Sequence, residues 1–140
     1  MIDTVRDFVS QQRLAIVGVS QQPKHFSRAL FRAFRERNFD AIPVNPSAPE
    51  IEGAVCYSRV QDIQPPVDTA LLMTAPAVTD QIVKDCADAG IRRVWMYRRS
   101  APAVAFCEAH GINVIAGECP LMYLAETGWV HRLHGWFHGV

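Results

Sequence analysis

The chain has 140 residues, 49% of them hydrophobic, and its 14 basic side chains balance its 14 acidic ones. This length suits one domain with a sizeable core, and a neutral chain lacks the positive surface that nucleic acids or anionic membranes attract. No apolar run approaches the ~18 residues of a membrane span, and the first residues do not resemble a signal peptide, so we expect a cytoplasmic protein with reduced thiols.

The first third of the sequence predicts helix, strand, helix and strand. Apolar residues at helical spacing predict a short amphipathic helix over 2–9. A short apolar run predicts a buried strand over 14–17, and a helix is expected over 27–37. The second strand is expected over 41–44. Pro43 lacks a backbone N–H there, which favours the edge of a sheet or the end of a strand.

The remaining elements continue this alternation. We expect a short extended piece over 55–57. Three further strands are expected over 68–73, 93–97 and 112–115, and two helices over 76–89 and 100–110. Strands that alternate with helices of about ten residues are typical of parallel βαβ units. We therefore predict an α/β fold: a Rossmann-like, doubly wound, mostly parallel sheet of about five strands in a single domain over 1–125, followed by a helical tail over 126–140.

Open parallel sheets bind ligands outside the carboxyl ends of their strands. Four segments of the sequence fall at such ends, namely Gly18 to Ser27, Asn45-Pro46, Thr74 to Ala77 and Gly117 to Pro120. We expect these segments to converge in space although they lie far apart in the sequence.

The first of these segments has the features of a phosphate-binding loop. Gly18 permits a sharp turn, and the start of the next helix offers free N–H groups and the positive end of its dipole. Ser20 and Ser27 add hydroxyl groups, and Lys24 and Arg28 add positive charge. An ordinary strand-to-helix loop with a serine cap is the alternative, since a single glycine does not make a G-x-G-x-x-G motif.

The end of the second strand argues against a dinucleotide ligand. NAD sites place an Asp or Glu there to bind the ribose hydroxyls. This chain has Asn45 followed by Pro46, and Asp40 stands at the other end of the strand. NAD(P)-type binding is therefore disfavoured, although an asparagine could still contact a ribose.

In order and spacing, these motifs resemble those of a known family. The sequence carries G-V-S-x-x-P at 18–23, P-V-N-P at 43–46, T-A-P at 74–76 and E-C-P at 118–120. This pattern resembles the stand-alone CoA-binding domain family, which is similar to the nucleotide-binding domain of the succinyl-CoA synthetase alpha subunit. The resemblance covers nearly all of residues 1–125 and implies coenzyme A or an acyl-CoA as the ligand.

The resemblance also implies a set of ligand-binding residues. These are Gly18, Ser20, Lys24, Ser27 and Arg28 at the phosphates, Asn45, Pro46, Pro76 and Ala77 at the nucleoside, and Cys119 and Pro120 near the pocket. Thr74 belongs to the same strand end as Pro76 and is included in the predicted site. Two features depart from the family: Glu118 stands where members often carry Arg, and the segment over 96–100 replaces a stretch of glutamine and glycine.

No catalytic residue is predicted. The phosphorylated histidine of the synthetase lies in a second domain, which this chain is too short to contain. Cys119 and a distant histidine could form a nucleophilic pair, but a buried, inert thiol is the favoured interpretation.

The tail carries His131, His134 and His138 on one face of the expected helix. Three imidazoles could bind zinc, but Gly135 weakens the helix and the tail has no Asp or Cys to complete a ligand set, so no metal is predicted. The aromatic side chains around them favour packing onto the domain, onto a second copy or onto a partner protein.

Three functions stay open at this point. The first is a CoA-binding module without its own catalytic centre, which senses or carries the cofactor or regulates a partner. The second is the non-catalytic half of an acyl-CoA-handling enzyme. The third is an interaction protein whose nucleotide pocket is vestigial. Lys24 and its neighbouring serines favour the first two, and the missing catalytic set favours the first.

Overall fold

The computed structural model describes residues 2–124, so the predicted tail and its histidines lie outside the described residues. Residues 2–124 form four named α-helices and a short 3-10 helix: α1 (Ile2–Val9), α2 (Phe26–Glu36), η1 (Val60–Asp62), α3 (Pro76–Asp88) and α4 (Ala101–Ala109). The strands are β1 (Arg13–Val17), β2 (Asp40–Val44), β3 (Glu50–Ile51), β4 (Ala54–Val55), β5 (Thr69–Leu72), β6 (Arg93–Met96) and β7 (Asn113–Ala116). Residues 120–124 form a further helical turn, the last helical turn among the described residues.

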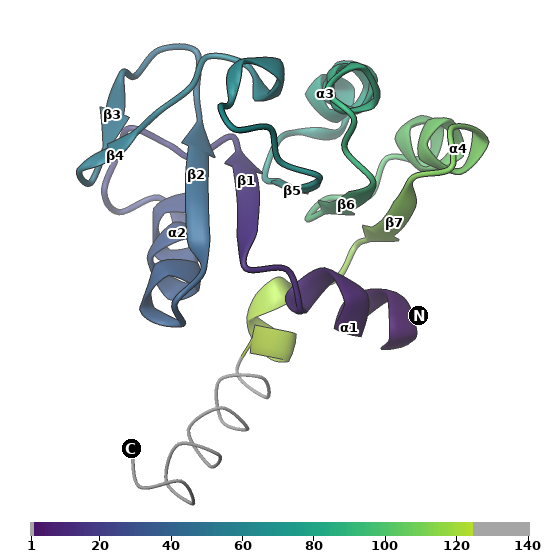
Figure 1. Cartoon of the computed structure of the whole chain (residues 1–140), viewed down its shortest axis with the longest axis horizontal. Coiled ribbons are helices and arrows are strands. Elements are labelled where there is room, and N and C mark those ends of the chain that lie inside the picture. Colours follow the sequence, from purple (N-terminus) through teal and green to yellow (C-terminus); the bar gives the residue numbers. More distant parts are fainter. Residues whose placement is uncertain (1, 125–140) are drawn as a thin grey trace, which may run out of the picture.

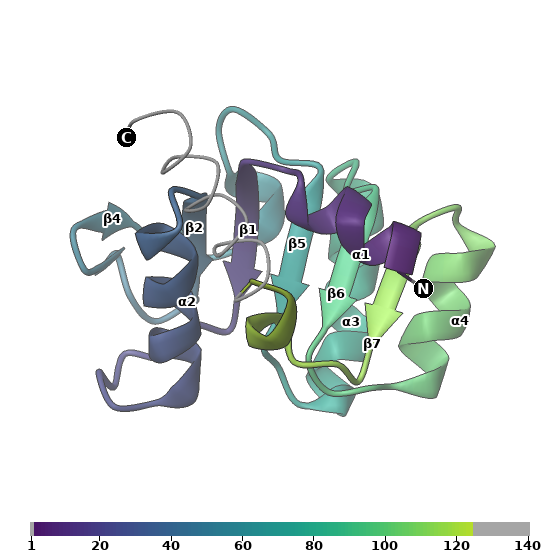
Figure 2. The ribbon, with the colours of Figure 1, turned by 90° about the horizontal axis from the view of Figure 1, so that it is seen from below.

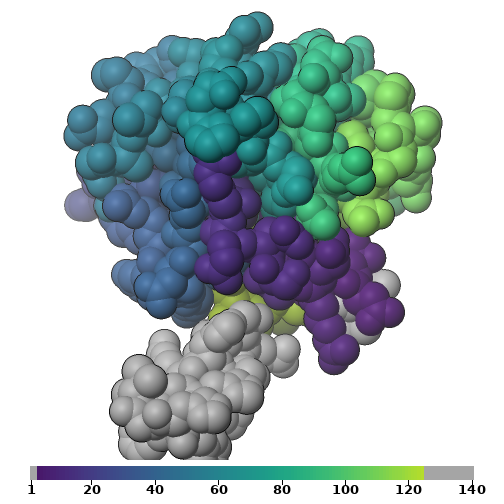
Figure 3. Space-filling model, viewed as in Figure 1, coloured from purple at the N-terminus to yellow at the C-terminus, as the bar shows by residue number. Residues whose placement is uncertain are grey.

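Five strands form a parallel sheet in the order β2-β1-β5-β6-β7, which confirms the predicted fold class. Helices cover both faces (Figure 1): α1, α2 and the turn over 120–124 lie on one side, and α3 and α4 lie on the other. As Pro43 predicted, β2 is an edge strand of this sheet. In the space-filling view, α1 packs closely against the body of the domain (Figure 3).

The side chains of each central strand divide between two cores, because successive residues point to opposite faces of a sheet. In β6, Val94 and Met96 pack on the side of α3 and α4, whereas Trp95 packs on the side of α1. The fully buried Trp95 ring makes edge contacts with Phe8 at 5.2 Å and with Tyr123 at 5.6 Å between ring centroids. This one side chain therefore joins α1 and the last helical turn to the sheet.

Two of the predicted helix starts follow from local chemistry. Pro76 occupies the first turn of α3, where a missing N–H removes no helical hydrogen bond. The Ser100 hydroxyl caps α4 by accepting a hydrogen bond from the N–H of Ala103. Ser27, in contrast, does not cap α2, because the ring of His25 takes that role.

The segment after β2 differs from the single extended piece that the sequence suggests. β3 and β4 pair as an antiparallel hairpin, and Tyr57 then adds a parallel bridge to Val44 at the end of β2. Glu52 has a φ of 48° and Gly53 a φ of 81°, and this left-handed backbone makes the tight turn between the two strands. Within the described residues, no helix is both long and apolar enough to span a bilayer.

Two valines at strand positions allow a matched test of this packing. Val94 is fully buried in β6, whereas Val55 is 65% exposed in β4. We expect Val94→Ala to lower the free energy of unfolding by about 2 kcal/mol, because two buried carbons are lost and a cavity remains. The same change at Val55 should cost less than about 0.5 kcal/mol. Urea denaturation of both variants measures the difference, and equal losses would contradict the assignment of the core.

Candidate functional site

The strands of the main sheet end in register. Val17 pairs with Val44 on one side and with Leu72 on the other, and the row continues through Met96 to Ala116. The arrowheads of β1, β5, β6 and β7 accordingly point to one edge of the sheet (Figure 2). The four predicted ligand-binding segments follow strands that end in this row, so the structure gathers them along the same edge. We call it the carboxyl edge.

Gly18 begins the first loop of the carboxyl edge and has a φ of 91°. A Cβ atom at this position would lie 3.0 Å from Cγ2 of Thr74 and 3.3 Å from the backbone of Met73. Residue 18 therefore needs both the conformational freedom and the small volume of glycine. Its N–H donates to the carbonyl of Val44 at 2.9 Å, so Gly18 contacts the chain on both sides of β1.

A buried hydroxyl group holds the middle of this loop. Ser27 is fully buried, and its Oγ accepts a hydrogen bond from the N–H of Ser20 at 2.9 Å. The same Oγ lies 2.8 Å from Nδ1 of His25, which also accepts from the N–H of Ser27 at 3.1 Å. The Ser27 hydroxyl thus faces inward and fixes the loop, and its predicted contact with a phosphate stays a prediction.

Arg28 also has partners inside the chain. Its guanidinium is buried and forms an ion pair with Glu52 at 2.8 Å, and Nη1 donates to the carbonyls of Ser20 and Gln21 at 3.2 and 3.0 Å. Glu52 also pairs with Arg32 at 2.8 Å. The hydrogen bond from Arg32, followed by contacts with Arg28, lowers the pKa of Glu52 against the opposing effect of burial. The Arg28 guanidinium therefore has partners within the chain and needs no ligand to satisfy its hydrogen bonds.

Lys24 lies in the exposed part of the same loop. Residues 21–26 are all exposed. Within residues 2–124, Lys24 makes no hydrogen bond or ion pair, which leaves its charge available to a ligand. The Ser20 hydroxyl accepts from the N–H of Gln22 at 3.0 Å and retains its own proton as a donor.

Asn45 joins the loop after β2 to the loop after β1. Its Nδ2 donates to the carbonyl of Val19 at 2.8 Å, and its Oδ1 accepts from the N–H of Ser47 at 2.7 Å. Both ends of the side-chain amide therefore have partners, whereas Pro46 is exposed beside it. The asparagine that replaces the acid of a NAD site serves here to hold two loops together.

The segment after β5 combines an internal hydrogen bond with an open helix start. Thr74 Oγ1 lies 2.6 Å from Oγ1 of the buried Thr79. Pro76 and Ala77 are exposed at the start of α3, where Ala75 provides no side-chain cap.

Cys119 differs from the other three cysteines. Burial raises the pKa of Cys56 and of Cys86, and it raises the pKa of Cys107 to about 11, so these thiols stay protonated near neutral pH. Cys119 is only partly buried, and the following Pro120 is buried at the start of the last helical turn. Among the described residues, no group of three or more metal-binding side chains is present.

The sequence did not predict an aromatic pair that lies on the carboxyl edge. Phe26, at the start of α2, lies against Tyr97, which follows β6, with ring centroids 5.4 Å apart. The two residues are far apart in the sequence and neither belongs to a periodic pattern, so no local signal indicates this contact. It places the segment after β6 beside the first loop, and Arg98 and Arg99 follow there, both exposed.

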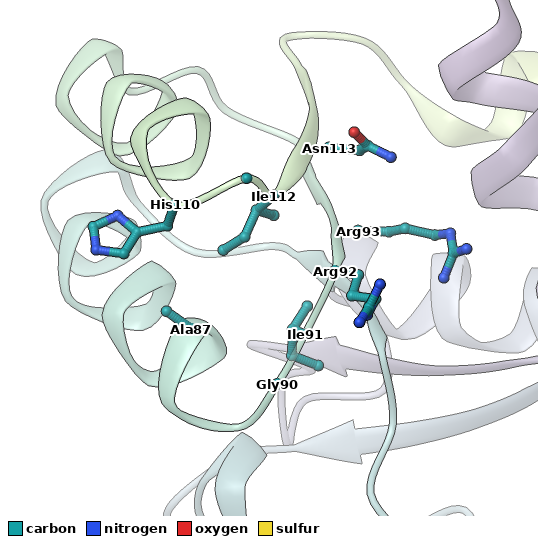
Figure 4. A pocket seen from close by; sticks show the side chains of 9 residues that line it. Ala87, Gly90, Ile91, Arg92, Arg93, His110, Ile112 and Asn113 are labelled. Atoms are coloured by element: carbon teal, nitrogen blue, oxygen red, sulfur yellow. The ribbon is translucent and has the colours of Figure 1, made fainter.

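Two hollows of the described surface lie away from these residues. One of about 510 Å³ is found beside the amino-terminal ends of β6 and β7, between Ala87, His110 and Ile91 (Figure 4). Arg93, at its margin, extends away from His110 and donates to Asp7 at 2.6 Å. The other hollow, of about 370 Å³, follows the outer side of β2. Neither hollow includes a residue of the predicted site, which rests on the carboxyl edge.

Comparison with known proteins gives consistent results. A family model described as a CoA binding domain matches residues 12–125. The chain is 27% identical over 79 residues to the ADP-forming acetate–CoA ligase of Methanocaldococcus jannaschii, and 22% identical over 125 residues to the alpha subunit of the ADP-forming acetate–CoA ligase II of Pyrococcus furiosus. These matches cover 56% and 80% of this chain but only 11% and 27% of the two relatives.

A solved structure shares the fold over almost its whole length. A hypothetical protein from Pyrococcus horikoshii superimposes with a TM-score of 0.83 and 25% sequence identity, and the match covers 91% of each chain. The match therefore shows the same fold in both chains.

The close approach at Gly18 can be tested against a second glycine. Gly18 and Gly53 both have positive φ, but a Cβ at Gly53 would meet nothing within 4 Å. We expect Gly53→Ala to cost about 1–2 kcal/mol of unfolding free energy for its backbone alone. Gly18→Ala should cost at least about 1 kcal/mol more, because it also displaces Thr74 or Met73. Denaturant titration measures both values, and equal costs would show that the contact with Thr74 imposes no constraint.

Proposed function

The chain belongs to the CoA binding domain family, and from this premise we propose that it binds coenzyme A or an acyl-CoA at its carboxyl edge, as a module without a catalytic centre of its own. The alignment of five strand ends in one row carries this proposal, because it brings the family's motifs together along one edge. The family match over residues 12–125 includes every one of those strand ends.

The first loop fits a phosphate group. Lys24 is exposed without a partner in the described chain, and the loop runs directly into the N-terminus of α2, where N–H groups and the helix dipole favour an anion. We assign the direct phosphate contacts to Lys24, to the Ser20 hydroxyl and to loop N–H groups at the start of α2. Ser27 and Arg28 act as positioning residues in this proposal, because their polar atoms already hold the loop in place.

The nucleoside then lies on the side of β2. Pro46 after β2 and Pro76 and Ala77 after β5 offer exposed apolar surface on which a base and a ribose can pack. Asn45 supports this surface, because its side-chain amide bonds the loop after β2 both to Val19 and to Ser47. From there the other end of the ligand extends towards β6 and β7, where Cys119 and Pro120 lie.

Two observations bear on the wider role of the module. Both acetate–CoA ligases contain much more chain than this protein matches. Their ligase activity thus belongs to chains several times longer than the matched region, which supports a binding role for the present domain. The likeness to a ligase alpha subunit favours a second candidate, in which the chain is the non-catalytic half of an acyl-CoA-handling enzyme.

Thermal denaturation with added nucleotides tests the choice of ligand. We expect coenzyme A to raise the melting temperature, because a ligand that binds only the folded state stabilises it. NAD should leave the melting temperature unchanged, since Asn45 stands in place of a ribose-binding acid and both ends of its amide are occupied. An equal shift with NAD, or no shift with coenzyme A, would contradict the proposed function.

The two lysines of the chain provide a matched test of phosphate binding. Lys24 lies in the first loop, whereas Lys84 is exposed within α3. We expect Lys24→Ala to weaken the binding of coenzyme A roughly tenfold at low salt, because one charge-assisted contact is lost. Lys84→Ala should bind as the unchanged protein does. The difference should shrink at high salt, where the charge contact is screened. Isothermal calorimetry measures these affinities, and identical values for the two variants would remove Lys24 from the site.

A further inference from the structure

The carboxyl edge is positively charged although the whole chain is neutral. Its five segments are 18–26, 45–49, 73–77, 97–100 and 117–120, and their charged residues are Lys24, Arg98, Arg99 and Glu118. The carboxyl edge thus carries three basic residues and one acidic residue. Lys24 belongs to the first loop, so the proposed phosphate site leaves the two arginines after β6 without an assigned role.

Neither arginine is neutralised by a partner within residues 2–124. Arg98 and Arg99 are exposed, and among residues 2–124 neither makes a hydrogen bond or an ion pair. Two acids close to this segment, one bonded to the residue after Arg99 and one at the neighbouring strand end, bind other groups. Asp80 accepts a hydrogen bond from Ser100, and Glu118 accepts one from Tyr123 at 3.4 Å. The two guanidinium groups are therefore free to bind an anion from outside the chain.

Two contacts and one close approach position this segment beside the first loop and the neighbouring strand ends. The N–H of Tyr97 donates to the carbonyl of Leu72 at 3.0 Å, which anchors the residue directly after β6. The Tyr97 ring lies against Phe26 at the start of α2. On the other side, a Cβ at Gly117 would lie 3.8 Å from Cβ of Arg99. β6 is separated from β1 by one strand, so the arginines follow a strand about 10 Å from the end of β1.

We propose that Arg98 and Arg99 bind a carboxylate at the acyl end of the ligand, so that the site selects acyl-CoA thioesters whose acyl group carries a negative charge. This inference rests on the proposed function, which puts the nucleoside beside β2 and directs the thioester end towards β6 and β7. A guanidinium group binds a carboxylate through two parallel N–H···O hydrogen bonds, so the contact is directional as well as electrostatic. The partly buried Cys119 and the Tyr97–Phe26 pair would then border the acyl chain.

The test compares glutaryl-CoA with valeryl-CoA, whose acyl chains have equal carbon number and differ in the terminal carboxylate. We expect the unchanged protein to bind glutaryl-CoA roughly tenfold more tightly, which corresponds to one charge-assisted contact. The double variant Arg98→Gln with Arg99→Gln should lose this preference and keep its affinity for valeryl-CoA. A control variant, Arg6→Gln with Arg92→Gln, removes the same charge at exposed positions in α1 and before β6, and should keep the preference.

Calorimetry distinguishes the failure of this inference from the failure of the proposed function. If the unchanged protein binds both thioesters equally, or if the double variant retains the preference, the inference is overturned while CoA binding stands. An equal loss of affinity for both thioesters in the double variant also overturns it, because the arginines would then contact a part common to both, such as the 3′-phosphate. If neither thioester nor free coenzyme A binds the unchanged protein, the proposed function fails and this inference fails with it.

Discussion

The approach of β1 to β5 at their carboxyl ends constrains everything on that edge of the domain. Residue 18 leaves β1 with a φ of 91°, and a Cβ there would lie 3.0 Å from Cγ2 of Thr74, so both the backbone conformation and the space at this position favour glycine. This exit directs the following residues over the end of the sheet and back into α2. The N–H of the same glycine donates a hydrogen bond to the carbonyl of Val44, so the ends of three neighbouring strands are fixed together at this point.

The loop that starts at Gly18 is held by groups that a phosphate site could also have used. Burial of the Ser27 hydroxyl is tolerated because the N–H of Ser20 and the ring of His25 satisfy it. The Arg28 charge is tolerated because Glu52, in the turn of the β3–β4 hairpin, compensates it. The hairpin is therefore part of the loop's support, and the loop can present Lys24 and backbone N–H groups without rearranging its own interior.

The sequence was a good guide wherever the signal was local. Runs of apolar residues located the five strands, and Pro43, Pro76 and Ser100 correctly indicated an edge strand and two helix starts. It was a poor guide wherever a side chain's partner lay far along the chain. Arg28 meets Glu52 at a separation of 24 residues, and nothing in the spacing of charged residues distinguishes that pair from a solvated one. The short β3–β4 hairpin was missed for a related reason, because two-residue strands carry no periodicity.

The same distinction between local signals and distant partners applies to the charged side chains. The arginines of α2 face a hairpin that holds a carboxylate, and Arg93 pairs with Asp7 and Asp68, so several cations of the chain serve its folding. A cation that has neither an internal partner nor a neighbouring acid is repelled by others of its kind, and it is most stable where an anion can approach. Only the topology reveals that Arg98 and Lys24, neither of which has a hydrogen-bond or ion-pair partner within residues 2–124, lie on one edge, because the end of β6 comes to lie beside the start of α2. Net charge, which is zero, conceals it.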